Sequence, residues 1–195
     1  MMKTSNTPQR VLVVSSDDNT FAYLKKILPH ESFNEILKAK TSNEAKRFLL
    51  TNTVDILIID APLTDEFGLD LACEYSQTSM GIMIMVNSSL YEQIAYRVED
   101  LGIFTMIKPN SVENIYSALQ ILSAMHKKLV KMEKKTKKLK EKMQDIKIIN
   151  QAKIILIQKL NMSENDAHYY IEKQAMDTRL SKSKVAENII RTYNY

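Results

Sequence analysis

The sequence predicts an α/β protein: a doubly wound, five-stranded parallel sheet, followed by a long coiled-coil helix and a small three-helix bundle. Two patterns indicate this. Up to about residue 110, short apolar runs alternate with segments of helical spacing, which is the rhythm of βα units. Between residues 111 and 151 there is no Gly or Pro, and apolar residues recur every three or four positions. We therefore expect a sheet domain over residues 1–120, a helical stem over 121–147 and a bundle over 148–195.

The composition is typical of a protein with a hydrophobic core in a reducing compartment. Hydrophobic residues make up 45% of the 195 residues, and the single cysteine, Cys73, rules out an internal disulfide framework. Residues 1–10 are polar and lack the apolar segment of a signal peptide, and no stretch is apolar enough for a membrane span. These features predict a cytoplasmic protein that does not enter a membrane.

Charge is divided unevenly along the chain. Residues 1–120 contain 10 Lys and Arg against 15 Asp and Glu, whereas residues 121–195 contain 17 against 8. An acidic half joined to a basic half is typical of a regulatory domain attached to a nucleic-acid binder. Basic tails also bind membranes and acidic proteins, so the charge alone leaves the partner open.

Five strands and four helices are expected to alternate in the first domain. The strands are expected at 11–14, 34–40, 54–59, 82–86 and 103–107, and the helices at 20–28, 41–49, 68–76 and 90–101. Thr41 and Glu44 form a capping box at the start of the second helix. In a doubly wound sheet the chemistry lies beyond the carboxyl ends of the strands. The candidate site residues are therefore those that follow each strand.

The residues at these ends are mostly small and polar or charged. They are Ser15, Ser16, Asp17 and Asp18 after the first strand, Asp60 after the third, Asn87 and Ser88 after the fourth, and Lys108 after the fifth. Pro62 and Gly68 follow Asp60 at two and eight residues, and Pro109 follows Lys108. Over about residues 10–123 this pattern resembles the receiver domain of bacterial two-component response regulators.

The resemblance implies that Asp60 is the phosphoacceptor and that Lys108 completes its pocket. It also implies two carboxylates at the end of the first strand, which would hold Mg²⁺ together with the phosphoacceptor. Ser15 and Ser16 occupy those two positions. Mg²⁺ binding is therefore expected to be weak or absent, and the domain is expected to be a degenerate receiver.

Two details of this pocket stay open in the sequence. A first strand shifted by two residues would bring Asp17 and Asp18 to the pocket and push the two serines into the buried run. The hydroxyl-bearing position of the family is filled by either Asn87 or Ser88. The resemblance further implies a histidine kinase or another regulatory protein as a partner of this domain.

The stem carries an a/d seam, the pattern of a helix that buries a narrow stripe against a partner helix. The seam residues are Leu122, Met125, Leu129, Met132, Thr136, Leu139, Met143, Ile146 and Asn150. The two polar residues of this seam cost stability but favour one register and a two-stranded state. Lys135 and Lys142 would each face a lysine of the partner helix, which weakens the pair. We expect a parallel homodimer that also presents charge to a polyanion; a solvated linker helix is the alternative.

The last part of the chain predicts three short helices in contact through alanines. Ser163 and Asp166 form a capping box at the start of the middle helix, and Lys184 to Thr192 form the last one. The segment 148–190 is similar to the ANTAR family of RNA-binding antitermination modules. The matching residues are Ala152, Lys153, Leu156, Ser163, Ala167, Ala175, Met176, Arg179, Val185, Ala186 and Ile189. Ile154, in place of the usual Gly, and Glu172, in place of a frequent Arg, depart from the family pattern.

The ANTAR resemblance implies binding to short RNA hairpins in a leader transcript, which prevents a terminator from forming. Hairpin loops offer unstacked bases for aromatic stacking and phosphates for basic side chains. The candidate RNA-binding residues are Gln151, Lys153, Lys159, Tyr169, Lys173, Arg179, Lys182, Ser183 and Lys184. Tyr170, next to Tyr169, is expected to face the core instead.

The leading hypothesis is an RNA-binding transcription antiterminator with an atypical receiver that ordinary phosphorylation does not control. The alternatives are a phosphorylation-dependent response regulator and a protein-interaction adaptor acting through the receiver-like domain. A DNA-binding regulator is disfavoured because no recognition helix rich in Arg, Asn and Gln follows a short turn. An enzyme is not expected, since the three histidines are scattered and form no constellation with the one cysteine. No metal site and no cofactor are expected.

Overall fold

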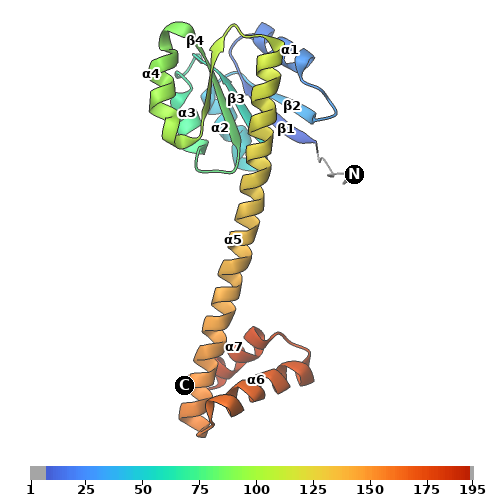
Figure 1. Ribbon diagram of the computed structural model, residues 1–195, viewed down its shortest axis with the longest axis vertical. Coiled ribbons are helices and arrows are strands. Elements are labelled where there is room, and N and C mark those ends of the chain that lie inside the picture. The colour runs from blue at the N-terminus through green and yellow to red at the C-terminus, as the bar shows by residue number, and fades with distance from the viewer. Residues whose placement is uncertain (1–7, 194–195) are drawn as a thin grey trace. The chain divides into compact units, whose positions relative to one another are not determined.

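The computed structural model describes residues 8–193 and contains two compact units, divided along the chain between Lys131 and Met132 (Figure 1). The elements are β1 (Gln9–Val14), α1 (Asp18–Ile27), β2 (Phe33–Ala39), α2 (Ser42–Thr51), β3 (Ile56–Asp60), α3 (Leu69–Tyr75), β4 (Gly81–Asn87), α4 (Ser88–Val98), the 3₁₀ turn η1 (Glu99–Leu101), β5 (Phe104–Lys108), α5 (Val112–Leu160), α6 (Glu164–Thr178) and α7 (Lys182–Tyr193). The prediction of a five-stranded parallel sheet followed by a long helix and further helices is confirmed.

The sheet has the strand order β2-β1-β3-β4-β5, and every pairing is parallel. The central strands β1, β3 and β4 are buried on both faces, which is why their sequences read as unbroken apolar runs. This order reverses direction between β1 and β3, so the carboxyl ends of these two strands flank the crevice where doubly wound sheets bind ligands.

Helices cover both faces of the sheet (Figure 1). On one face, side chains of α2, α3 and α4 pack against alternate residues of the strands. On the other face, α1 and the first turns of α5 cover the remaining residues, with Leu24 from α1 and Leu119 from α5 at the centre. Burying an aliphatic side chain of this size stabilises the fold by about 1.5–3 kcal/mol. The two layers together position the carboxyl edge of the sheet.

The part of α5 that packs on the sheet domain extends beyond residue 120, where the sequence predicted that this domain ends. Leu122, expected to open the coiled-coil seam, is 1% exposed and lies in the core beneath the sheet. A Cβ added at Gly81 would lie 3.1 Å from the Cβ of Leu122, so the glycine permits this close approach of helix and strand. The expectation that Leu122 faces a partner helix is therefore wrong, because an amphipathic helix on a sheet and a coiled coil share the same spacing at this point.

A polar contact fixes α5 to the sheet domain one turn later. His126 Nδ1 donates to the carbonyl oxygen of Ser79 at 2.7 Å, and His126 Nε2 lies 2.9 Å from Asp55 Oδ1. The hydrogen bond from His126 is the main reason that the pKa of Asp55 lies below its usual value. The backbone N–H of Arg10 donates to the other oxygen of this carboxylate at 2.8 Å. Asp55 therefore joins the first strand to the helix.

The second unit is a three-helix bundle made by the end of α5 with α6 and α7. Its core consists of Ala152, Leu156, Ala167, Ile171, Ala175, Val185, Ala186 and Ile189. The predicted cap is present, since Ser163 Oγ accepts from the backbone N–H of Asp166 at 3.1 Å. The last helix begins at Lys182, two residues before the expected start, because Ser181 Oγ accepts from the backbone N–H of Lys184. No helix within residues 8–193 is long and apolar enough to cross a membrane.

Candidate functional site

The carboxylate of Asp60 lies at the carboxyl edge of the sheet, with a partner on each oxygen. Asp60 ends β3 and is 6% exposed. Ser15 Oγ donates to Asp60 Oδ2 at 2.8 Å, and Lys108 Nζ lies 2.5 Å from Oδ1. Ser15 is fully buried directly after β1, and Lys108 ends β5. The charge of this buried carboxylate is thus balanced by one cation and one hydroxyl donor.

The register of the central strands settles which residues of the first loop reach this pocket. Val14 pairs with Ile59, so Ser15 lies next to Asp60. The residues from 11 to 14 are all fully buried, and a shift of two residues, the alternative that the sequence left open, is not what the structure adopts. Ser16 is exposed and makes no hydrogen bond to Asp60.

The two carboxylates after Ser16 serve other purposes. Asp17 caps α1 and accepts from the backbone N–H groups of Asn19 and Thr20 at 3.0 and 3.1 Å. These bonds, with that of Asn19 first, hold the pKa of Asp17 below its usual value. Asp18 accepts from Lys38 and Lys40, and the bond from Lys38 is the main cause of its lowered pKa. The expectation that Asp17 belongs to the pocket is therefore wrong: α1 begins at Asp18, and the side chain of Asp17 caps that helix.

A cavity of about 520 Å³ opens beside Asp60, and Asn87 lines it. Asn87 ends β4 and pairs with Lys108 in the sheet register, whereas Ser88 is the first residue of α4. Of the two candidates for the hydroxyl position, Asn87 is the one whose side chain borders the pocket. An amide is in that position where the family has a hydroxyl.

The residues around Asp60 do not fit a divalent cation. Mg²⁺ requires oxygen ligands in an octahedral arrangement, usually with one or two carboxylates. Asp60 is the one carboxylate lining this cavity, and Lys108 and Ser15 already contact both of its oxygens. Within residues 8–193, no group of three or more His, Cys, Asp and Glu lies close enough together to hold a metal ion.

In the second unit, three of the predicted RNA-binding lysines are engaged by carboxylates. Lys153 Nζ lies 3.0 Å from Glu164 Oε1, and Lys184 Nζ lies 2.8 Å from Glu187 Oε2. Lys182 contacts Glu172, the residue that replaces a frequent arginine of the family. That bond lowers the pKa of Glu172. Lys153 and Glu164 are eleven residues apart and Lys182 and Glu172 are ten apart, so these two pairs form only in the folded bundle. Lys184 and Glu187 are three residues apart on one helix, a spacing that the sequence does show.

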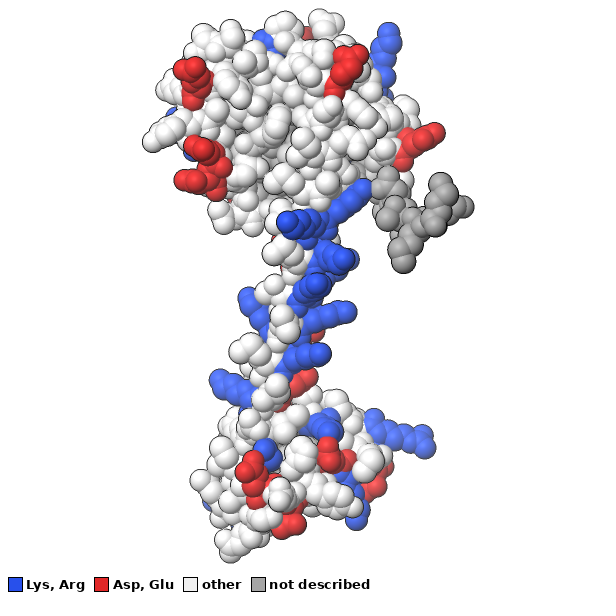
Figure 2. Space-filling model, viewed as in Figure 1, with Lys and Arg blue, Asp and Glu red and all other residues white. Residues whose placement is uncertain are grey.

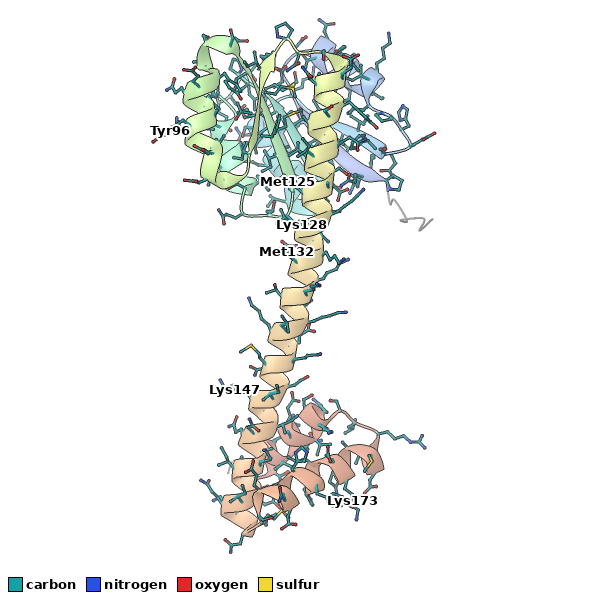
Figure 3. All side chains as sticks on the ribbon, in the orientation of Figure 1. Tyr96, Met125, Lys128, Met132, Lys147 and Lys173 are labelled. Atoms are coloured by element: carbon teal, nitrogen blue, oxygen red, sulfur yellow. The ribbon has the colours of Figure 1, made fainter. Side chains whose placement is uncertain are left out.

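The other candidates differ in exposure. Arg179 directly follows α6 as its C-cap, in the left-handed conformation with φ of 55°, and has no ion-pair partner among the described residues. Lys159, Lys173 and Gln151 are exposed, and Figure 3 shows Lys173 pointing away from α6 into solvent. Tyr169 is 63% exposed, whereas Tyr170 packs against the bundle core, as expected. Ser183 is half-buried, with its Oγ 3.1 Å from that of Ser181.

We predict that Lys108→Met destabilises the sheet domain by about 2 kcal/mol, because it leaves the buried Asp60 carboxylate without its cation. The double variant Asp60→Asn/Lys108→Met should lose less stability than Lys108→Met, because the amide of Asn accepts the Ser15 hydrogen bond and needs no cation. Lys26→Met, at an exposed position of α1, is the control and should change stability by less than about 0.5 kcal/mol. Hydrogen exchange of the peptide that contains β3, measured by mass spectrometry, reports these differences. Equal losses in the single and double variants would contradict the ion pair.

The comparisons with known proteins agree with both units. Residues 137–190 match the model of the ANTAR domain. The transcriptional regulatory protein PdtaR of Mycobacterium tuberculosis is 24% identical over 186 residues, which cover 95% of this chain and 91% of that protein. The aliphatic amidase regulator of Pseudomonas aeruginosa is 25% identical over 126 residues, which cover 65% of this chain and 63% of that protein.

The first unit has the fold of solved receiver domains. A response regulator receiver domain protein from Methanospirillum hungatei has a TM-score of 0.56 at 19% identity and covers 63% of this chain and 99% of its own. A receiver domain from Clostridium thermocellum has a TM-score of 0.56 at 20% identity and covers 62% of this chain and 98% of its own. The chain therefore joins a receiver-fold domain to a C-terminal ANTAR domain, which is the architecture of ANTAR response regulators.

Proposed function

We propose that this protein is a transcription antitermination regulator whose ANTAR domain binds hairpins in a leader transcript and so prevents a terminator from forming. The observation that carries the proposal is the ANTAR match over residues 137–190, joined to a receiver fold as in a relative that is itself a transcriptional regulatory protein. A protein that acts on nascent transcripts works in the cytoplasm, beside RNA polymerase. No step of this function requires a cofactor.

The geometry of the bundle ranks the basic residues for RNA contact. Arg179 and Lys173 have no carboxylate within ion-pair distance among the described residues, so they can approach a phosphate or a base edge without breaking a bond. Lys153, Lys182 and Lys184 must first release Glu164, Glu172 and Glu187. Tyr169, exposed on the second turn of α6, offers a ring on which an unstacked loop base can stack. Arg179 is therefore the strongest single candidate.

We predict that Arg179→Ala weakens the binding of the target hairpin by about 1–3 kcal/mol, the cost of losing a base contact. Arg191→Ala, an exposed arginine of α7 outside the candidate set, is the matched control and should change affinity less. The target is identified by sequencing RNA that copurifies with the protein, and fluorescence anisotropy then measures affinity. Equal affinity for duplex DNA of any sequence would contradict specific recognition of RNA.

We infer that the receiver-fold domain is not switched by ordinary phosphorylation. Both oxygens of Asp60 are engaged, and the two first-loop carboxylates point elsewhere, so the charge that would hold Mg²⁺ is missing from the pocket. Control would then come from a partner protein, from a ligand or from protein abundance. The first alternative is a conventional phosphorylation switch driven by a histidine kinase. The second alternative is a protein-interaction adaptor that acts through the receiver-fold domain.

A phosphodonor assay separates the first two functions. The protein is mixed with acetyl phosphate or phosphoramidate and Mg²⁺, and its intact mass is measured. We expect only a minor adduct, because without the metal Lys108 is the one cation lining the pocket that could neutralise the phosphoryl oxygens during transfer. A stoichiometric adduct that is absent from Asp60→Asn would restore the conventional switch.

We also propose a parallel homodimer through α5. Beyond Leu122 the apolar seam residues are exposed in the single chain, from 40% for Leu129 to 71% for Met143. A stripe of this kind is stabilised when a partner helix covers it. The lysines beside the seam oppose this pairing, so the dimer is expected to be weak at low salt.

We predict that the protein sediments as a dimer at tens of micromolar and that added salt strengthens the dimer by screening the lysines, with a Debye length of about 3 Å at 1 M. Leu139→Lys should produce a monomer, because it places a charge in the seam. Gln144→Lys, at an exposed position outside the seam, is the control and should leave the dimer intact. A wild-type monomer at both low and high salt would rule out this interface.

A further inference from the structure

The positive charge of the basic half of the chain is concentrated on α5 rather than in the bundle. Residues 127–147 contain ten lysines and three acidic residues, whereas residues 148–195 contain seven basic and five acidic residues. Within the bundle, ion pairs engage three of the basic side chains. The bundle that resembles an RNA-binding module is thus close to neutral, and the helix that leads into it is strongly basic.

The exposed part of α5 has two sides with different chemistry (Figure 2). Lys134 lies eighteen residues before Ala152, and Lys138 lies eighteen residues before Leu156, which is five whole turns at 3.6 residues per turn. These lysines therefore point to the side of the helix on which α6 and α7 pack, because Ala152 and Leu156 belong to the bundle core. Lys142, one turn further, continues the row. We call Lys134, Lys138 and Lys142 the lysine face.

The apolar seam occupies the opposite side. Met143 lies nine residues, or two and a half turns, from both Lys134 and Ala152. Figure 3 shows Lys147, which lies near the seam, pointing away from α6 and α7. A partner helix on the seam would thus leave the lysine face and the bundle uncovered.

The lysine face is open to an external anion. Its three side chains are exposed, and none has a carboxylate within 4 Å in the part of the chain that the structure describes. Successive members are four residues apart, so the ammonium groups recur about every 6 Å over a row of about 12 Å. A row of unpaired, evenly spaced cations matches a polymer of phosphates better than a small anion, which would use one or two of them.

We propose that the lysine face binds the phosphate backbone of the RNA whose loop is held by the bundle. This inference rests on the proposed function and adds to it a second contact, to the double-stranded stem of the hairpin. Double-stranded RNA is recognised largely through its shape and its phosphates, so this contact is independent of sequence. The bundle selects the loop, and the lysine face adds affinity by releasing counterions from the stem.

The test compares two triple variants of the full chain that remove the same charge from opposite sides of one helix. The first is Lys134→Gln/Lys138→Gln/Lys142→Gln. The control is Lys128→Gln/Lys140→Gln/Lys147→Gln, all exposed and all on the side of the helix that carries Met143. Circular dichroism and sedimentation establish that both variants keep the helix and the oligomeric state of the wild type. Affinity for the target hairpin and for a hairpin with a scrambled loop is measured across a salt series.

The lysine-face variant should reduce the slope of log affinity against log salt by about 2, since each neutralised phosphate contributes about 0.7–0.9. It should weaken both hairpins equally, so their affinity ratio stays the same. The control variant should change the slope by less than half as much. Equal slope changes in the two variants, or none in the first, would overturn the inference. A wild type that binds both hairpins equally would refute the proposed loop recognition instead, while the slopes still test the lysine face.

Discussion

The receiver-fold domain is organised around the buried carboxylate of Asp60 and the two side chains that satisfy it. A charge at 6% exposure is tolerated only where partners compensate for the lost water. Lys108 supplies the cation from β5 and Ser15 the hydroxyl from the end of β1. The three side chains come from the ends of three strands, so the contact requires the register of the whole sheet. Each oxygen of Asp60 already has one protein partner, and no second carboxylate lines the pocket to help hold a metal.

Helix α5 connects this domain to the ANTAR domain and presents a different surface in each of its three parts. Its first turns bury Leu119 and Leu122 under the sheet, and His126 fastens it to Asp55. Its middle part exposes an apolar seam on one side and the lysine face on the other. Its last turns supply Ala152 and Leu156 to the bundle. One uninterrupted helix can do this because its sequence changes which side is apolar without any Gly or Pro.

The fold could be predicted from the sequence because its signals are local. The runs around Val13 and Ile58 are buried on both faces and read as strands without any knowledge of their neighbours. Asp60 and Lys108 were found because parallel strands bring their carboxyl ends together. Asp17 was misplaced although a local signal existed, since an Asp directly before a helical segment is a favoured cap. What decided its role was the start of α1 at Asp18, two residues earlier than the apolar spacing indicated.

The contacts that the sequence did not predict mostly join residues far apart in the chain, which no local pattern encodes. The hydrogen bond between Ser15 and Asp60 joins residues 45 apart and follows from the register of β1 and β3. The pairing of Lys182 with Glu172 requires the turn at Arg179. Leu122 was assigned to the seam because a helix that packs on a sheet and a helix that packs on another helix show the same spacing of apolar residues. These are contacts that only the folded chain could reveal.

The central claim is that this regulator acts on RNA without a phosphorylation switch. Single-round transcription through a terminator preceded by the target hairpins tests it most directly, with the protein purified without phosphodonor. The account predicts that the wild type and Asp60→Asn raise read-through to the same extent above the level without protein, and that Arg179→Ala raises it less. Read-through that appears only after treatment with a phosphodonor, and that Asp60→Asn abolishes, would contradict it.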